Sequence, residues 1–419
     1  MAGAGAVALG PDFWRRAYAA PATSGPGPYG ALQGPDVNGI QLPAGFSSRV
    51  VARSGQPVGT PPYPWHVFPD GGATFPTGDG GWVYVSNSES PALTGGGCSA
   101  VRFASDGAVA SAYRILSGTS QNCAGGPTPW GTWLSCEEYE GGRVWECDPL
   151  APGQGVVRPL LGTFSHEAAA VDPVGKRLYL TEDQPDGRFY RFTPAAYPDL
   201  SAGTLEAASV GAGDVLSWVP VDPLVPARLN RPAGTTVFRG GEGCWYDSGF
   251  VYFTTKGDNR VWSFETATSR LEVIYDDDNF AAGQAPLTGV DNVTVSRSGD
   301  ILVAEDGGNL EIVLITPEPN RVAAPLIRLQ GQDGSEVTGP AFDPSGSRLY
   351  FSSQRAGGPS PGAGPGITYE VSGPFRGAAP VPVIPESGLT PLLPASALAA
   401  LGAAYVLKLR RRQDETGAG

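Results

Sequence analysis

Short hydrophobic runs alternate with turn-forming residues through the middle of the chain, and they recur in one order. Each repeat has a short apolar run, a tight turn, and a second run rich in Val, Tyr and Phe. Runs of this kind between Gly, Pro, Asn and Asp predict strands joined by hairpins. The repeats cover residues 71–89, 129–147, 166–192, 241–264, 290–315 and 337–355, with a late strand near 367–371.

The spacing of the second runs predicts the architecture. Successive ends lie 48, 45, 74, 49 and 49 residues apart, and the long step contains extra residues at 193–238. A hairpin repeat of about 45–50 residues is typical of a propeller. We therefore expect an all-β, six-bladed β-propeller over residues 40–375, with a pair of irregular β-sandwiches as the alternative. The second runs end near Glu89, Glu137, Glu182, Lys256, Glu305 and Gln354.

Composition agrees with an all-β chain and narrows its function. The 419 residues include 60 glycines and 41 prolines, yet 41% are hydrophobic, which is enough to bury a large core. A net charge of −13 excludes nucleic-acid binding, because that requires clustered Lys and Arg. The two histidines, His66 and His166, exclude a zinc site built on several histidines.

Both ends of the chain predict export. Residues 1–39 have the composition of an export-signal remnant and a mobile arm, with Ala17-Tyr18-Ala19 as a cleavage pattern. Residues 376–388 form a proline-rich spacer. Residues 389–407 are uncharged and precede a basic cluster, which predicts a C-terminal transmembrane anchor and basic tail over 389–419. The body would then lie at the cell surface, as a monomer. A docked Ala-rich helix is the alternative.

Acidic residues recur at equivalent positions of the repeats. A hairpin brings the start of its first strand beside the end of its second, and in a propeller these ends surround one mouth of the channel. We therefore expect several carboxylates and the Cys136 thiol to converge on one cavity. The first-strand positions are Glu167, Glu242 and Asp291, and the second-strand positions are Glu89, Glu137-Glu138, Glu182-Asp183 and Glu305-Asp306.

Such a cavity predicts a polynuclear metal site. Like charges packed closely are costly unless protons or cations neutralise them. Carboxylate oxygens suit Ca²⁺, whereas a thiolate suits a softer transition metal. The alternatives are solvated carboxylates at strand ends and a buried, inert Cys136 thiol.

The remaining candidate residues are less clear. Cys244 fits a buried, inert thiol, and Cys98 and Cys123 lie in loop-like stretches where a disulfide could form. His166, directly before Glu167, could be a ligand, a proton carrier or a structural residue.

Several strings resemble the PhoX-type alkaline phosphatases over about residues 40–375. That resemblance implies a six-bladed propeller and an exported enzyme, often sent out by the twin-arginine route. It also implies a site with iron and calcium that hydrolyses phosphate monoesters. The strings are TPWGTWLSCEE (128–138), SHEAAAVDP (165–173), LTEDQPDGRFYRF (180–192), GEGCWY (241–246), DN (291–292), AEDGG (304–308) and TGPAFDPSGSRLYFSSQR (338–355).

The resemblance also implies site residues. It places the iron-binding cysteine at Cys136 and metal-binding carboxylates at Glu137, Glu167, Glu182, Glu242, Asp291 and Glu305. The chain departs from the family in three respects. It is short for the family, and it has Asn87-Ser88-Glu89 where the family tends to have Asn-His-Glu. The family's phosphate-binding arginine has no exact match, because Arg239 lies one position too early.

These observations predict metal-assisted hydrolysis of a small phosphorylated substrate. Cys136, Glu167, Glu242 and Arg239 are the candidate catalytic residues, and Lys256 is a second candidate for holding the phosphate. One alternative is a calcium propeller that hydrolyses lactones and needs no thiolate. The other is a non-catalytic surface protein in which calcium stabilises the blades.

Overall fold

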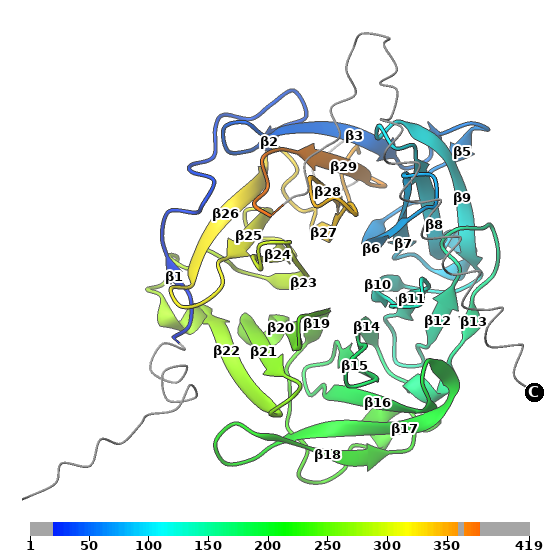
Figure 1. Cartoon of the computed structure of the whole chain (residues 1–419), viewed down its shortest axis with the longest axis vertical. Coiled ribbons are helices and arrows are strands. Elements are labelled where there is room, and N and C mark those ends of the chain that lie inside the picture. Colours follow the sequence, from blue (N-terminus) through cyan, green and yellow to red (C-terminus); the bar gives the residue numbers. More distant parts are fainter. Residues whose placement is uncertain (1–19, 359–363, 378–419) are drawn as a thin grey trace, which may run out of the picture. The chain divides into compact units, whose positions relative to one another are not determined.

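Six β-sheets stand as blades around a central axis (Figure 1). The computed structural model describes residues 20–358 and 364–377. Neighbouring strands within each blade run antiparallel, and most of them are joined by short turns. The all-β, six-bladed propeller predicted from the repeat spacing is therefore confirmed.

The first three blades follow one another along the chain. Blade one contains β6 (Pro69–Pro76), β7 (Trp82–Ser88), β8 (Gly97–Phe103) and β9 (Val109–Ser117). Blade two contains β10 (Asn122–Pro127), β11 (Trp133–Glu137), β12 (Val144–Cys147) and β13 (Val156–Val157). Blade three contains β14 (His166–Asp172), β15 (Arg177–Glu182), β16 (Phe189–Ala196), β17 (Asp199–Val210) and β18 (Leu216–Val221).

The last three blades complete the ring. Blade four contains β19 (Gly241–Asp247), β20 (Phe250–Thr255), β21 (Arg260–Glu265) and β22 (Arg270–Asp276). Blade five contains β23 (Val290–Val295), β24 (Ile301–Glu305), β25 (Glu311–Ile315) and β26 (Val322–Leu329). Blade six contains β27 (Val337–Phe342), β28 (Arg348–Ser353), β29 (Ile367–Ser372) and β3 (Ser47–Arg53).

The remaining elements are short. Strands β4 (Pro57–Val58) and β5 (Tyr63–Pro64) form a separate hairpin. Single 3₁₀ turns cover η1 (Ala92–Thr94), η2 (Pro159–Leu161), η3 (Ala227–Leu229), η4 (Lys256–Asp258) and η5 (Asp277–Asn279). No described helix is long and apolar enough to cross a membrane. The anchor predicted at 389–419 lies outside the described residues.

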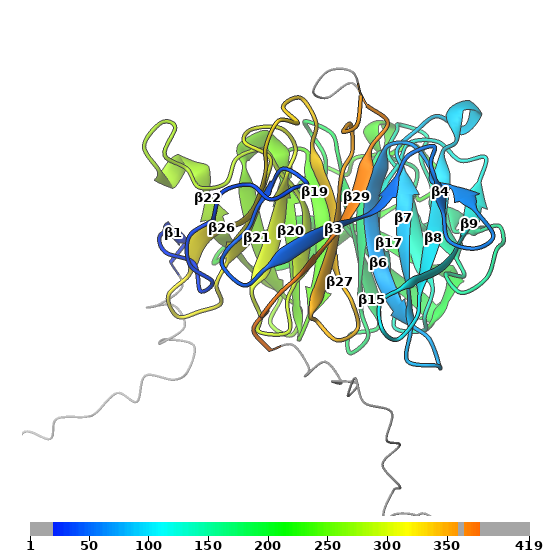
Figure 2. The same ribbon diagram turned by 90° about the horizontal axis from the view of Figure 1, so that it is seen from above.

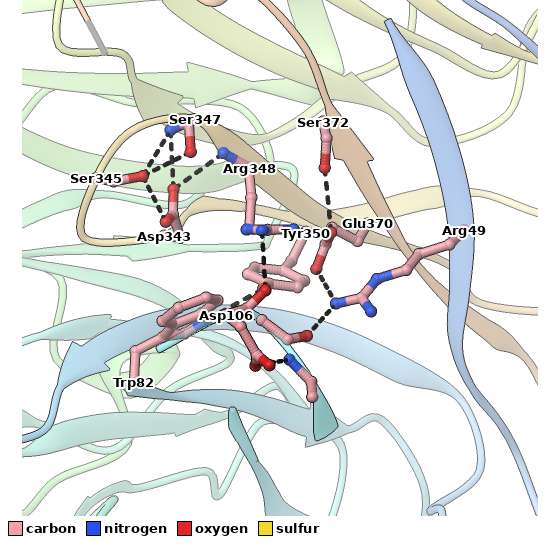
Figure 3. A network of polar contacts seen from close by, with 12 residues as sticks. Arg49, Trp82, Asp106, Asp343, Ser345, Ser347, Arg348, Tyr350, Glu370 and Ser372 are labelled. Carbon is pink, nitrogen blue, oxygen red and sulfur yellow. Dashed lines mark hydrogen bonds and ion pairs between the residues drawn. The ribbon is translucent and has the colours of Figure 1, made fainter. Parts of the chain in front are cut away.

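Blade six is closed by a strand from the other end of the chain. β3 pairs with β29, so residues far apart in sequence share one sheet (Figures 1 and 2). On it, Glu370 is buried between Arg49 at 2.6 Å and Arg348 at 2.7 Å (Figure 3). The same two guanidinium groups donate to the carbonyls of Gly107 and Asp106 in blade one. This network therefore joins the last blade to the first.

The segment before β3 lies along the outside of blade five. β1 (Thr23–Ser24) pairs parallel with β26, and β2 (Ile40–Gln41) pairs antiparallel with the same strand. The described part of the segment assigned from sequence to a mobile arm thus has a defined place against the propeller.

The extra residues of the third repeat extend blade three and then cross its edge. After β18, residues 222–240 form a segment that we call the crossover segment. Ala227 N donates to Thr163 O at 2.9 Å, and Phe238 N donates to Gly187 O at 3.0 Å. These bonds hold the crossover segment in place where it passes from the side of blade two to the start of blade four.

Candidate metal centre

In five of the six blades, the second residue of the innermost strand is an Asp, Glu or Cys, whose side chain can bind a metal ion. The sixth blade has Thr338 at this position. In each of the five strands the pairing register shifts between the residue before this position and the second residue after it. Such β-bulges redirect side chains and are common beside functional sites. The five buried residues, which we call the inner ring, are Asp70, Cys123, Glu167, Glu242 and Asp291.

The inner ring and three nearby glutamates form three compact groups of potential ligands. In each group the ligand atoms lie within 4.8 Å of one another. Glu167 belongs to two groups, so these two form one continuous site. Cluster one is Cys123, Glu138 and Glu167; cluster two is Glu167, Glu242 and Asp291; cluster three is Asp70, Glu89 and Glu336.

Two buried amides each bridge a pair of these carboxylates. Asn292 Nδ2 donates to Asp291 Oδ1 at 2.8 Å and to Glu167 Oε1 at 3.4 Å. Gln354 Nε2 donates to Asp70 Oδ2 at 2.6 Å and to Glu89 Oε2 at 2.8 Å. Each amide fixes the separation and orientation of two acidic side chains.

The site concentrates negative charge away from water. Burial, together with neighbouring carboxylates, raises the pKa of Glu167 and Asp291 well above the usual range and that of Glu138 to about 9. Lys256 Nζ lies 2.9 Å from Glu242 Oε1 and 3.2 Å from Asp306 Oδ2. Burial alone would lower the pKa of Lys256, but the carboxylates of Glu242, Asp291 and Asp183 raise it. One lysine does not balance so many acids.

The residues fit the metals that the sequence resemblance implies. The buried Glu167 Oε2 has no hydrogen-bond partner among the described residues, as expected of an atom that faces a cation. Clusters one and two combine carboxylates with a thiol, a donor set suited to a transition metal. Cluster three offers only oxygens and suits a hard cation such as Ca²⁺.

Glycines close the channel beneath the inner ring. A Cβ at Gly71 would lie 2.4 Å from Ala124 Cα, and one at Gly339 would lie 2.6 Å from Asp70 O. The cavity lined by these glycines and Gly243 has a volume of about 20 Å³, which is room for about one water molecule. A substrate must therefore approach the ring from the opposite side, at the mouth.

The structure separates the carboxylates predicted from sequence into two sets. Glu167, Glu242 and Asp291 meet in cluster two, whereas Glu137, Glu182 and Glu305 belong to none of the clusters. Each of these three accepts a hydrogen bond from the backbone N–H six residues further along. The donors are Arg143 N at 3.2 Å, Arg188 N at 3.0 Å and Glu311 N at 3.0 Å, respectively. The second set therefore holds the turn that follows the second strand.

Cys136 lies away from the acidic clusters. It is fully buried in a hydrophobic cluster with Leu134, Val144 and Phe164. Side chains alternate along a strand, so the carboxylate after Cys136 and the thiol face opposite ways. The thiol that lies among the acids is Cys123, whose Sγ donates to Asp70 Oδ2 at 3.5 Å.

Sequence reasoning missed Asp70, Cys123 and Glu336 as candidate ligands. The second repeat was started at Pro129, although its first strand is β10 (Asn122–Pro127), so Cys123 fell into an assumed loop. One signal was available. Asp70, Cys123, Glu167 and Glu242 are each followed by Gly or Ala, and this ligand-plus-small pair marks the start of the inner strand.

The other candidates belong to none of the three clusters, except Cys123. His166 is buried and stacks on Phe164 at 3.6 Å, and burial lowers its pKa to about 3, so its imidazole is neutral. No disulfide joins Cys98 and Cys123, which are both buried free thiols. Arg239 is exposed and lines an open pocket together with Lys256.

Together these features define the class of protein. It is a six-bladed propeller whose channel narrows at three glycines beside a buried ring of carboxylates with one thiol.

Comparison with known proteins relates the chain to one family. The family model of alkaline phosphatase PhoX matches residues 84–145 and 139–275. The structure of Pseudomonas fluorescens PhoX in complex with vanadate, a transition state analogue, has a TM-score of 0.67 at 17% identity. The match covers 82% of this chain and 98% of that one. The chain is therefore a propeller that resembles PhoX in fold, and it resembles the PhoX family in sequence over residues 84–275, as its motifs indicate.

Other comparisons are more distant. A gluconolactonase from Xanthomonas campestris has 15% identity and a TM-score of 0.43, with 83% of this chain and 99% of that chain covered. No curated protein matches the chain.

Proposed function

We propose that this chain is a metal-dependent phosphoric monoester hydrolase that acts outside the cytoplasm. One observation carries the proposal. A PhoX-type propeller brings a thiol and four acidic residues from five blades into a single inner ring at the open mouth of its channel.

The proposed metal centre combines iron and calcium. Cys123, Glu138, Glu167, Glu242 and Asp291 would hold iron, because clusters one and two join through Glu167 and include the thiol. The all-oxygen cluster three would hold calcium. Bound there, the cations would supply Lewis acidity that polarises the phosphoryl oxygens and neutralises the charge that develops on them.

The chain's own residues position the substrate. Lys256 lies between the inner ring and the open pocket, so its ammonium group would contact the phosphoryl oxygens of a bound ester. Arg239 lines the same pocket and would add a second positive charge there. Gly71, Gly243 and Gly339 leave little space for water beneath the ring.

Cellular location and partners remain part of this proposal. We expect an exported monomer that acts on small phosphorylated substrates and is held at the cell surface by residues 389–419. These residues lie outside the described structure.

The test is hydrolysis of aryl and alkyl phosphates by the full chain, expressed with export and loaded with iron and calcium. The proposal expects turnover that is lost after chelation and restored by adding both metals. Chelator-sensitive folding without turnover of any ester would support the non-catalytic alternative. Lactone hydrolysis with calcium alone would support the lactonase alternative.

A further inference from the structure

An open pocket of about 640 Å³ lies directly beside the inner ring. Three segments form it: Asp183–Asp186 after β15, residues 237–240 at the end of the crossover segment, and Lys256-Gly257 after β20. Lys256 belongs to the pocket and also contacts Glu242 of the ring, so the two spaces adjoin. A phosphoryl group at the ring would direct the organic part of its ester into this pocket.

Backbone hydrogen bonds hold the three segments together. Gly240 N donates to Gln184 O at 2.8 Å, Lys256 N donates to Gly240 O at 2.7 Å, and Gly257 N donates to Arg239 O at 3.0 Å. The pocket is thus a formed feature of the fold, and its walls do not depend on a single side chain.

The side chains of one wall are apolar. Val237 is 45% exposed although its neighbour Phe238 is buried and packs on Phe253 with ring centroids 5.4 Å apart. Pro185 completes this wall. Phe238 anchors the crossover segment, which leaves Val237 available to a ligand.

Two of the four charged side chains that line the pocket are engaged in ion pairs within the fold. Lys256 is paired with Glu242 and Asp306, and Asp186 is paired with Arg231. Paired charges gain little from contact with the hydroxyl groups of a polyol, because those groups are already well hydrated in water. An apolar group, in contrast, gains by leaving water against Val237 and Pro185.

We infer that Val237 and Pro185 select phosphate monoesters with an apolar organic group, such as aryl or alkyl phosphates, over esters of sugars and small polyols. This inference rests on the proposed function, because it requires the phosphoryl group to bind at the inner ring. Val237 is a specificity-determining residue in this scheme, and it takes no part in the chemistry.

The test uses ligands that cannot be hydrolysed, so that binding is measured apart from turnover. Phenylphosphonate and methylphosphonate are titrated into the metal-loaded full chain by calorimetry. We expect phenylphosphonate to bind about tenfold more tightly, and Val237→Ser to reduce that ratio about fourfold without weakening methylphosphonate. The control is Val174→Ser, because Val174 is 82% exposed on the β14–β15 turn and lies outside the pocket.

The outcomes separate this inference from the proposed function. Equal affinity for the two phosphonates, or an equal effect of Val237→Ser on both, would overturn the inference while leaving hydrolysis untouched. If the phenyl preference depends on Val237 but phenyl phosphate is not hydrolysed, the pocket assignment stands and the proposed function fails.

Discussion

The Cys123 thiol donates a hydrogen bond to Asp70 across the seam between blade two and blade one, with Sγ 3.5 Å from Oδ2. Cys136 lies on the next strand of blade two, and its thiol is enclosed by hydrophobic side chains. Burial raises the pKa of both thiols. A cation bound among the acids would stabilise the thiolate of Cys123 alone.

This contrast gives the first prediction. Cys123→Ser should abolish stoichiometric iron binding, because serine removes the single soft donor from clusters one and two. Cys136→Ser should keep its iron and lose stability by about 1–3 kcal/mol, since a hydroxyl would be buried in an apolar site. Elemental mass spectrometry and urea denaturation of both variants check this. Iron retained by Cys123→Ser and lost by Cys136→Ser would reverse the assignment.

The places of Cys123 and Cys136 in the structure show what the sequence could and could not predict. The ends of the second strands were predicted to within one residue, because Val, Tyr and Phe runs between turn residues are a clear signal. The first strands are weaker signals, since their bulges and glycines break the alternation. Cys123 and Asp70 lie on such strands, and so both were missed.

The sequence also does not separate carboxylates of the clusters from carboxylates that only hold the fold, because both kinds lie at strand ends. Glu182 ends its strand and Glu167 begins one, yet only Glu167 lies in a cluster. Strand position alone does not decide whether a side chain faces the channel or its own blade. That choice depends on the bulge and on partners such as Tyr190 and Arg231, which are distant in sequence.

The second prediction separates structural from ligand glutamates. Glu182 accepts hydrogen bonds from Arg188 N and Tyr190 and pairs with Arg231 at 2.6 Å. Glu182→Gln should therefore lower the free energy of unfolding by about 3 kcal/mol, the cost of breaking a buried ion pair, while metal content stays unchanged. Glu167→Gln should instead lower the metal content and leave the free energy of unfolding of the metal-free protein unchanged. Metal loss in Glu182→Gln at full stability would place Glu182 among the ligands.

The third prediction concerns the amide that bridges cluster three. Gln354→Met should weaken calcium binding, because Asp70 and Glu89 lose the donor that holds them in place. Iron content should remain unchanged, since Asn292 still donates to Asp291 and Glu167 of clusters one and two. Calcium titration followed by metal analysis measures both quantities. Gln332→Met is the control, because Gln332 donates to Tyr369 and not to a cluster; the same calcium affinity in both variants would refute the role of Gln354.

The fourth prediction concerns the network that joins blade six to blade one. Burial alone would raise the pKa of Glu370, but Arg49 and Arg348 hold it below the usual value of a glutamate, 4.5. Because the folded-state pKa is depressed, this stability is present above about pH 4.5 and is lost as the pH falls further. Glu370→Gln should cost about 2 kcal/mol at neutral pH. Urea denaturation gives the difference in the free energy of unfolding between wild type and variant, and this difference should become smaller at about pH 3. A difference that does not depend on pH would contradict the ion-pair account.

The fifth prediction concerns removal of the metals. Without cations the carboxylates of clusters one to three must repel one another or take up protons, and both cost folding free energy. A chelator should therefore lower the thermal midpoint, and added calcium should raise it in proportion to the logarithm of its concentration. Differential scanning calorimetry of the full chain measures this shift. The variant Glu336→Gln removes one acid of cluster three and should reduce the calcium dependence. If neither chelator nor calcium changes the thermal midpoint, these clusters are not occupied by metal in the folded protein.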